Sequence, residues 1–145
     1  MKIAITIVLM FLLSYLVGVW LTPGEKKITP ESIIVSNCDL TVSRCSVSFK
    51  NEVVTTSVVG EPSPLNPFIV NVSVVGKQAP LSVEIEFTMD GMDMGFNKYH
   101  LKLAGDVWKV RSILPVCSLG EKTWNLIVRL NLKESKKIIY FKIKQ

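Results

Sequence analysis

Residues 124–132 read Trp-Asn-Leu-Ile-Val-Arg-Leu-Asn-Leu and contain the most regular alternation of the 145-residue chain. A large apolar side chain occupies every second position: Trp124, Leu126, Val128, Leu130 and Leu132. Because successive side chains of a β-strand point to opposite faces of its sheet, this period predicts a strand with one buried face. The fold prediction extends outward from this strand.

Apolar residues keep the same period in segments on both sides of it. These segments are 45–49, 68–74, 81–89, 99–103, 108–114 and 139–143, together with a Val- and Thr-rich segment at 53–59. Turn residues separate them, such as the three prolines of 61–67 and the Gly105-Asp106 pair. We therefore expect an all-β fold, an immunoglobulin-like antiparallel β-sandwich of about seven or eight strands.

The N-terminal residues follow a different pattern. Residues 3–21 carry no charge, and these 19 residues would extend roughly 28 Å as a helix, close to the ~30 Å hydrocarbon core of a bilayer. The bulky Val19, Trp20 and Leu21 precede Pro23, so no small-residue cleavage site follows the apolar run. We expect one transmembrane helix, an anchor or uncleaved signal, at 1–22, a linker at 23–37 and the β-sandwich domain at 38–145.

The chain has a formal net charge of +5, and many of its lysines lie near the C-terminus. Lysines along a last strand protect an exposed edge from pairing with other chains, so this charge does not indicate a nucleic-acid partner. Contact with anionic lipid is a second interpretation. The only histidine, His100, lies between Lys98 and Lys102, where we expect a solvated strand residue and no metal role.

Residues 89–97 read Met-Asp-Gly-Met-Asp-Met-Gly-Phe-Asn and depart from the β pattern. Met89 continues the alternation of the preceding strand and is predicted to pack in the core, whereas Met92 and Met94 lie beyond Gly91. Residues two apart in extended backbone point the same way, so both thioethers can face one ion. Thioether and thiolate sulfurs are soft donors that suit Cu(I).

The three cysteines are predicted to lie near these methionines. Antiparallel strands reverse direction in turn, so the loops alternate between the two ends of a sandwich. Counted from 91–96, the segment with Cys117, the start of the strand at Cys45 and the proline-rich 61–67 all fall at the same end. Three cysteines also leave one thiol over after any disulfide.

Two interpretations of these sulfurs remain open. In the structural one, Cys38 pairs with Cys45, or Cys45 pairs with Cys117, and the methionines only fill a loop. In the functional one, Cys38 and Cys45 form a disulfide while Met92, Met94 and Cys117 bind Cu(I) as three sulfur ligands.

Four stretches within residues 80–132 resemble a known family. They are Val83-Glu84-Ile85-Glu86-Phe87, Met92-Asp93-Met94-Gly95-Phe96-Asn97, Gly105-Asp106-Val107-Trp108 and Trp124-Asn125-Leu126-Ile127-Val128. They look like the exported YtkA-like and FixH-like domains of bacterial envelopes, in which Met or His precedes a Gly at the position of Met92 and Met94. This chain departs from that pattern, since its loop has no histidine and Leu-Pro-Val-Cys follows at 114–117. Together with Cys38 and Cys45, that tetrapeptide is also similar to uncharacterised bacterial envelope proteins.

The resemblance implies an immunoglobulin-like, membrane-anchored envelope protein that binds or delivers Cu(I) during metallocentre assembly. Its partners would be a membrane-bound oxidase of the cytochrome oxidase type or its assembly factors. It would cross the bacterial inner membrane once, with its C-terminal domain in the periplasm. The alternative is a non-metal accessory β-sandwich that binds a membrane protein through the loops at this end. The chain shows no nucleophile with a neighbouring base, so we do not expect an enzyme.

We predict that the apolar N-terminal segment stays attached to the mature protein, because no small-residue cleavage site follows Leu21. Intact-mass measurement of protein extracted from membranes should give a mass that includes residues 1–22. A mass that lacks this segment would show that it is a removed signal.

Overall fold

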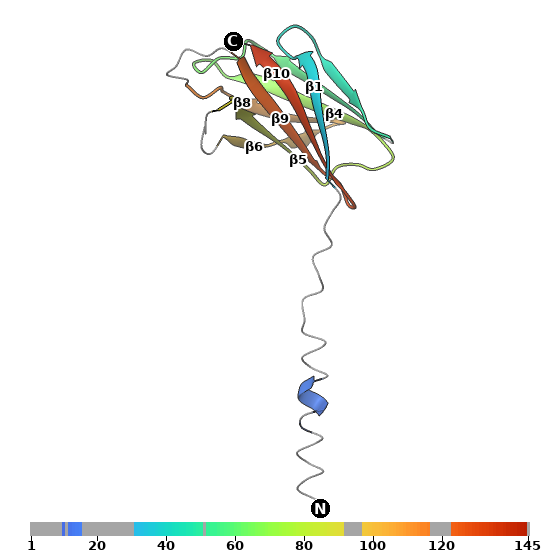
Figure 1. Ribbon diagram of the computed structural model, residues 1–145. Coiled ribbons are helices and arrows are strands. Elements are labelled where there is room, and N and C mark those ends of the chain that lie inside the picture. The colour runs from blue at the N-terminus through green and yellow to red at the C-terminus, as the bar shows by residue number, and fades with distance from the viewer. Residues whose placement is uncertain are drawn as a thin grey trace, which may run out of the picture.

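Ten β-strands pair into two sheets in the computed structural model, which describes residues 10, 12–15, 31–50, 52–91, 97–116 and 123–144. Sheet I has the order β1-β10-β9-β5-β6 (Figure 1). Its strands are β1 (Glu31–Asp39), β10 (Lys136–Lys144), β9 (Thr123–Asn131), β5 (Ser82–Thr88) and β6 (Lys98–His100). All neighbours in it are antiparallel except β1, which runs parallel to β10.

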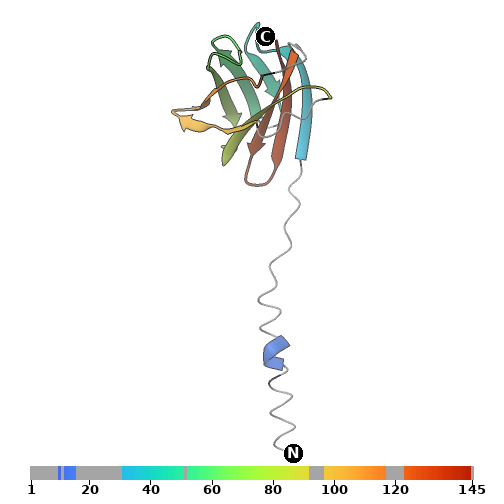
Figure 2. The same ribbon diagram turned by 90° about the vertical axis from the view of Figure 1, so that its left-hand side faces the viewer.

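Sheet II has the order β2-β3-β4-β8-β7, with every pair antiparallel. Its strands are β2 (Cys45–Ser48), β3 (Glu52–Val59), β4 (Phe68–Gly76), β8 (Val107–Ser112) and β7 (Lys102–Ala104). The two sheets form two layers, seen one beside the other in Figure 2. The predicted β-sandwich is therefore confirmed. We call the end that carries the C-terminus in Figures 1 and 2 the upper end, and the end with the β9–β10 turn the lower end.

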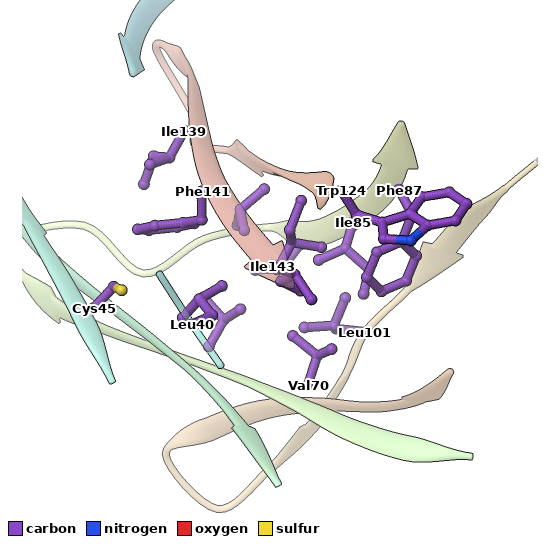
Figure 3. Close-up of a cluster of buried hydrophobic side chains, with 14 of the residues drawn as sticks. Leu40, Cys45, Val70, Ile85, Phe87, Leu101, Trp124, Ile139, Phe141 and Ile143 are labelled. Carbon is purple, nitrogen blue, oxygen red and sulfur yellow. The ribbon is translucent and has the colours of Figure 1, made fainter. Parts of the chain in front are cut away.

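The side chains of the two sheets meet in a continuous apolar core (Figure 3). On β9, Trp124, Leu126 and Val128 are fully buried, and Leu130 is 1% exposed, so the predicted inward face of this strand is confirmed. Phe87 of β5 contacts Phe68 of β4 edge to face, with ring centroids 5.7 Å apart, and this pair joins the two sheets.

The predicted number of strands is too low, for two reasons. The expected strand at 99–103 is divided at the buried Leu101 into β6 of sheet I and β7 of sheet II. Beyond this change of sheet Leu103 lies on an edge strand and is 58% exposed, although the period had placed it in the core. The segment 31–37, which belongs to the expected linker, forms most of β1. Its side chains are mostly exposed because β1 is an edge strand, so it lacks a clear apolar period.

The predicted anchor at 1–22 falls outside the described residues, apart from residue 10 and residues 12–15, which are helical. No helix in the described part of the chain has the length and apolar character needed to cross a membrane.

A buried ion pair joins the sheets at the lower end. Lys137 of β10 donates a hydrogen bond to the carboxylate of Glu52 on β3, and the two side chains are 10% and 8% exposed. The ammonium also lies 4.4 Å from the ring centroid of Phe49. Burial lowers the pKa of Lys137, while the carboxylate and the ring favour its charged form.

Trp124→Ala should destabilise the protein by about 3–5 kcal/mol, because a fully buried indole would leave a cavity between the sheets. Urea unfolding of the full-length protein in neutral detergent measures this change. Thr123→Ala, at the exposed neighbouring position, is the control and should shift the free energy of unfolding by less than about 0.5 kcal/mol. A loss below about 1 kcal/mol for Trp124→Ala would contradict the core position of the indole.

Lys137→Ala should cost about 3–5 kcal/mol, because it leaves the carboxylate of Glu52 buried without a countercharge. The double variant Glu52→Leu/Lys137→Met should be more stable than Lys137→Ala, since it removes both charges and keeps most of the volume. Equilibrium unfolding of both variants gives the comparison. If the double variant is the less stable of the two, the unpaired carboxylate of Glu52 is not the main cost of Lys137→Ala, and the prediction is wrong.

Candidate functional site

The upper end of the sandwich collects the segments that the sequence analysis had placed together. In register, Thr88 of β5 lies opposite Asn125 of β9, and Thr123 lies opposite Lys144 at the C-terminus. The amide of Leu114, after β8, donates to the carbonyl of Ser63 in the proline-rich loop at 3.1 Å. The alternation of loops between the two ends is therefore as predicted in the described part of the chain.

A disulfide between Cys38 and Cys45 joins β1 of sheet I to β2 of sheet II. The two Cα atoms are 5.9 Å apart. Cys45 is 1% exposed and packs in the core with Leu40 (Figure 3). The predicted Cys38–Cys45 pairing is confirmed, and it excludes the alternative in which Cys45 pairs with Cys117. With three cysteines in the sequence, Cys117 then has no cysteine left to pair with inside the chain.

Asp39 anchors the disulfide loop to the last residues of β10. Burial alone would raise the pKa of Asp39, but hydrogen bonds from Thr41 and the Lys144 ammonium 3.3 Å away lower it below its ordinary value. Thr41 also exchanges hydrogen bonds with the backbone of Lys144, at 2.8 and 3.1 Å. The loop 40–44 is thus fixed on both sheets.

The segment with Met92 and Met94 begins at residues that are fixed to β9. Met89 is 6% exposed and packs in the core, as predicted. Asp90 is exposed and accepts a hydrogen bond of 2.7 Å from Asn125. Asn125 accepts one of 2.8 Å from Lys142 of β10. The start of the methionine segment is therefore held against the strand that follows Cys117.

The end of the methionine segment is fixed in turn to the residues before Cys117. Asn97 is buried and donates to the carbonyl of Phe87 at 3.0 Å, which holds the start of β6 against β5. The hydroxyl of Tyr99 on β6 donates to the carbonyl of Ile113 at 3.3 Å. Ile113 lies four positions before Cys117 in the sequence. Both flanks of the methionine segment thus contact flanks of the cysteine segment.

The predicted ligands themselves, Met92, Met94 and Cys117, lie outside the described residues. Within the described residues, no three His, Cys, Asp or Glu side chains form a group that could hold a metal ion. His100 is exposed on sheet I, where its ring nitrogen lies 3.4 Å from the carboxylate of Glu84, in agreement with a solvated strand residue.

Sequence reasoning missed the polar network of Asp90, Asn125 and Lys142. These residues border an open cavity of about 240 Å³ that Val35, Tyr140 and Thr88 also line. The signal in the sequence was weak, because Asn125 and Lys142 occupy ordinary outward positions of alternating strands. Only the register of β9 between β5 and β10 places the three side chains together.

No family model, no curated protein and no solved structure matches this chain.

Proposed function

We propose that this protein binds Cu(I) at the upper end of its sandwich, through Met92, Met94 and Cys117. The observation that carries the proposal is the pair of hydrogen bonds between the flanks of the two segments. Asp90 and Asn125 join one pair of flanks, and Tyr99 and Ile113 join the other. Two short segments that are held together on both sides can bring side chains of both to one ion.

The disulfide supports the same proposal because it joins Cys38 to Cys45 and leaves Cys117 out. Cys38 and Cys45 are oxidised and cannot be ligands, so the one remaining thiol is Cys117, in the segment whose flanks hydrogen-bond to the flanks of the methionine segment. Two thioethers and one thiolate would provide a soft trigonal set that favours Cu(I) over harder divalent ions. The backbone at Gly91, with φ of 75°, allows the chain to turn sharply just before Met92.

The order of the strands supports an immunoglobulin-like topology within the confirmed sandwich. Strands β3-β4-β8-β7 follow the order A-B-E-D, and β5, β9 and β10 take the places of C, F and G, with β6 added beside C. This topology places the proposed site where loops can vary without disturbing the core.

Three exposed apolar side chains lie at the upper end of the sandwich and favour a docked partner protein. Val42 is 82% exposed in the disulfide loop, Leu65 is 85% exposed in the proline-rich loop, and Val116 is 76% exposed beside Cys117. A protein that delivers Cu(I) to a metallocentre needs such a contact surface around the ion. We propose a membrane-bound oxidase or its assembly factor as this partner, and an N-terminal anchor in the inner membrane with the domain in the periplasm.

The same three residues support a second candidate function, an accessory β-sandwich that binds a membrane protein without metal. Both candidates use the upper end, but only the first needs the sulfurs. The two candidate functions therefore differ in the role of Met92 and Met94, and a measurement of Cu(I) binding distinguishes between them.

Replacing both Met92 and Met94 by Ala should weaken Cu(I) binding by roughly a hundredfold or more and leave the melting temperature unchanged, since both lie past the apolar alternation that ends at Met89. Met89→Ala should do the reverse, and lower stability by about 2–4 kcal/mol with little effect on the ion. Competitive Cu(I) titration and melting curves of the full-length protein measure both. A mild reductant should keep copper as Cu(I) and leave the disulfide intact.

Thiol counting of the protein purified without reductant provides the control, and it should find one free thiol per chain. Cu(I) affinity that does not change in the Met92→Ala/Met94→Ala variant would reject the site. The accessory function would then take its place.

A further inference from the structure

The solvent face of sheet II contains an open hollow of about 450 Å³. Its floor consists of small hydroxyl and amide side chains, Thr55, Ser57, Asn71 and Ser73. Arg44 and Lys109 border it, and Val107 is its one apolar lining residue. In Figure 1 this face belongs to the layer that contains β4 and β8.

The register of sheet II aligns these side chains in one row across the strands. Lys102 of β7 lies opposite Lys109 of β8, Lys109 lies opposite Asn71 of β4, and Asn71 lies opposite Ser57 of β3. Arg44 directly precedes Cys45, whose partner is Thr56, so it extends the row beyond Ser57. Residues directly opposite in antiparallel strands share a face. We call these five residues, Arg44, Ser57, Asn71, Lys109 and Lys102, the basic row.

The charges of the basic row are not compensated inside the described part of the protein. Lys102 and Lys109 are exposed and directly opposite each other, and like charges in this position destabilise a sheet. None of Arg44, Lys102 and Lys109 forms an ion pair with a described carboxylate. Arg111, two positions beyond Lys109, adds a fourth cation on the same strand face. A bound anion would remove this repulsion.

The centre of the row also has an unused hydrogen-bond acceptor. The side-chain carbonyl oxygen of Asn71 is buried and has no hydrogen-bond partner among the described residues. Ser46 and Thr55, one row away, exchange a hydrogen bond of 2.9 Å and form a polar border. A ligand that donates from a hydroxyl group would satisfy Asn71, and its acidic groups would meet the cations at both ends of the row.

We propose that the basic row binds an acidic polysaccharide, a chain that carries both hydroxyl groups and carboxylate, sulfate or phosphate groups. The hydroxyl and amide floor matches the sugar hydroxyls, and the flanking cations match the acidic groups. Nucleic acid fits less well, because the lining has no aromatic side chain on which a base could stack. A lipid surface fits less well, because Val107 is the only apolar residue of the lining. An acidic peptide that bound as an added strand would need an open strand edge, and this is a sheet face.

This proposal is independent of copper binding. The basic row crosses the middle of sheet II, whereas the sulfur segments belong to the upper end. A carrier with such a face would be retained at an anionic glycan while its upper end remains free for a partner.

Binding of a size-defined oligouronate to the full-length protein in neutral detergent tests the proposal by isothermal titration calorimetry. Lys102→Gln/Lys109→Gln should weaken binding by about tenfold or more and reduce its salt dependence, because fewer counterions are released. Asn71→Ala should weaken binding and leave the salt dependence unchanged, since it removes a hydrogen bond and no charge. Neither variant should lower the melting temperature of the wild type, because the changed side chains lie on the solvent face; loss of the Lys102–Lys109 repulsion should raise it slightly in the lysine variant.

Lys133→Gln/Lys136→Gln is the matched control, since it removes the same charge at two exposed lysines of the β9–β10 hairpin. It should bind the oligouronate as the wild type does. Equal weakening by both double variants would reject the basic row in favour of diffuse charge. Equal binding of a neutral oligosaccharide would also reject it. Tighter binding of a single-stranded oligonucleotide of the same charge, or of micelles containing an anionic phospholipid, would assign the face to that other class of partner.

Discussion

The structure depends on the burial of β9 on both of its faces. Its inward side chains, from Trp124 to Leu130, form the centre of the core, and they are fully enclosed between the sheets. On the outward face Ile127 is only 5% exposed, because Tyr140 of β10 and Glu86 of β5 lie opposite it on the neighbouring strands. A strand covered in this way fixes the register of both neighbours. The register of β5 on β9 then determines where the methionine segment begins. The register of β10 on β9 determines where Lys142 and Lys144 lie at the upper end.

The same constraint explains why the upper end can carry a site. Backbone and side-chain hydrogen bonds from β5, β6, β9 and β10 hold the flanks of every segment there, and the Cys38–Cys45 disulfide joins the first strands of the two sheets. Loops mounted on such a frame can bear exposed apolar and sulfur-containing residues that a core would not need. The proposed Cu(I) site and the exposed Val42, Leu65 and Val116 are therefore aspects of one surface.

The outer faces of the two sheets differ in how their charges are balanced. On sheet I, Glu86 lies 2.5 Å from Arg129 and 3.9 Å from Lys98, and Glu84 pairs with His100, so acidic and basic side chains alternate between neighbouring strands. On sheet II, Lys102 and Lys109 lie opposite each other, and neither forms an ion pair with a described carboxylate. The contrast is the physical basis for assigning a ligand to sheet II.

The sequence by itself determined the β class, the inward face of β9, the core position of Met89 and the end of the sandwich at which Cys38 and Cys45 lie. These properties follow from a period of two and from the reversal of successive strands, which are local in origin. The tertiary structure decided what depends on neighbours distant in sequence. The expected strand is divided at Leu101 between the two sheets, and β1 lies parallel to β10. Cys38 is the partner of Cys45, Glu52 pairs with Lys137, and the basic row forms across sheet II. Register across strands has no signature within a single strand, and for this reason the pattern of residues could not show it.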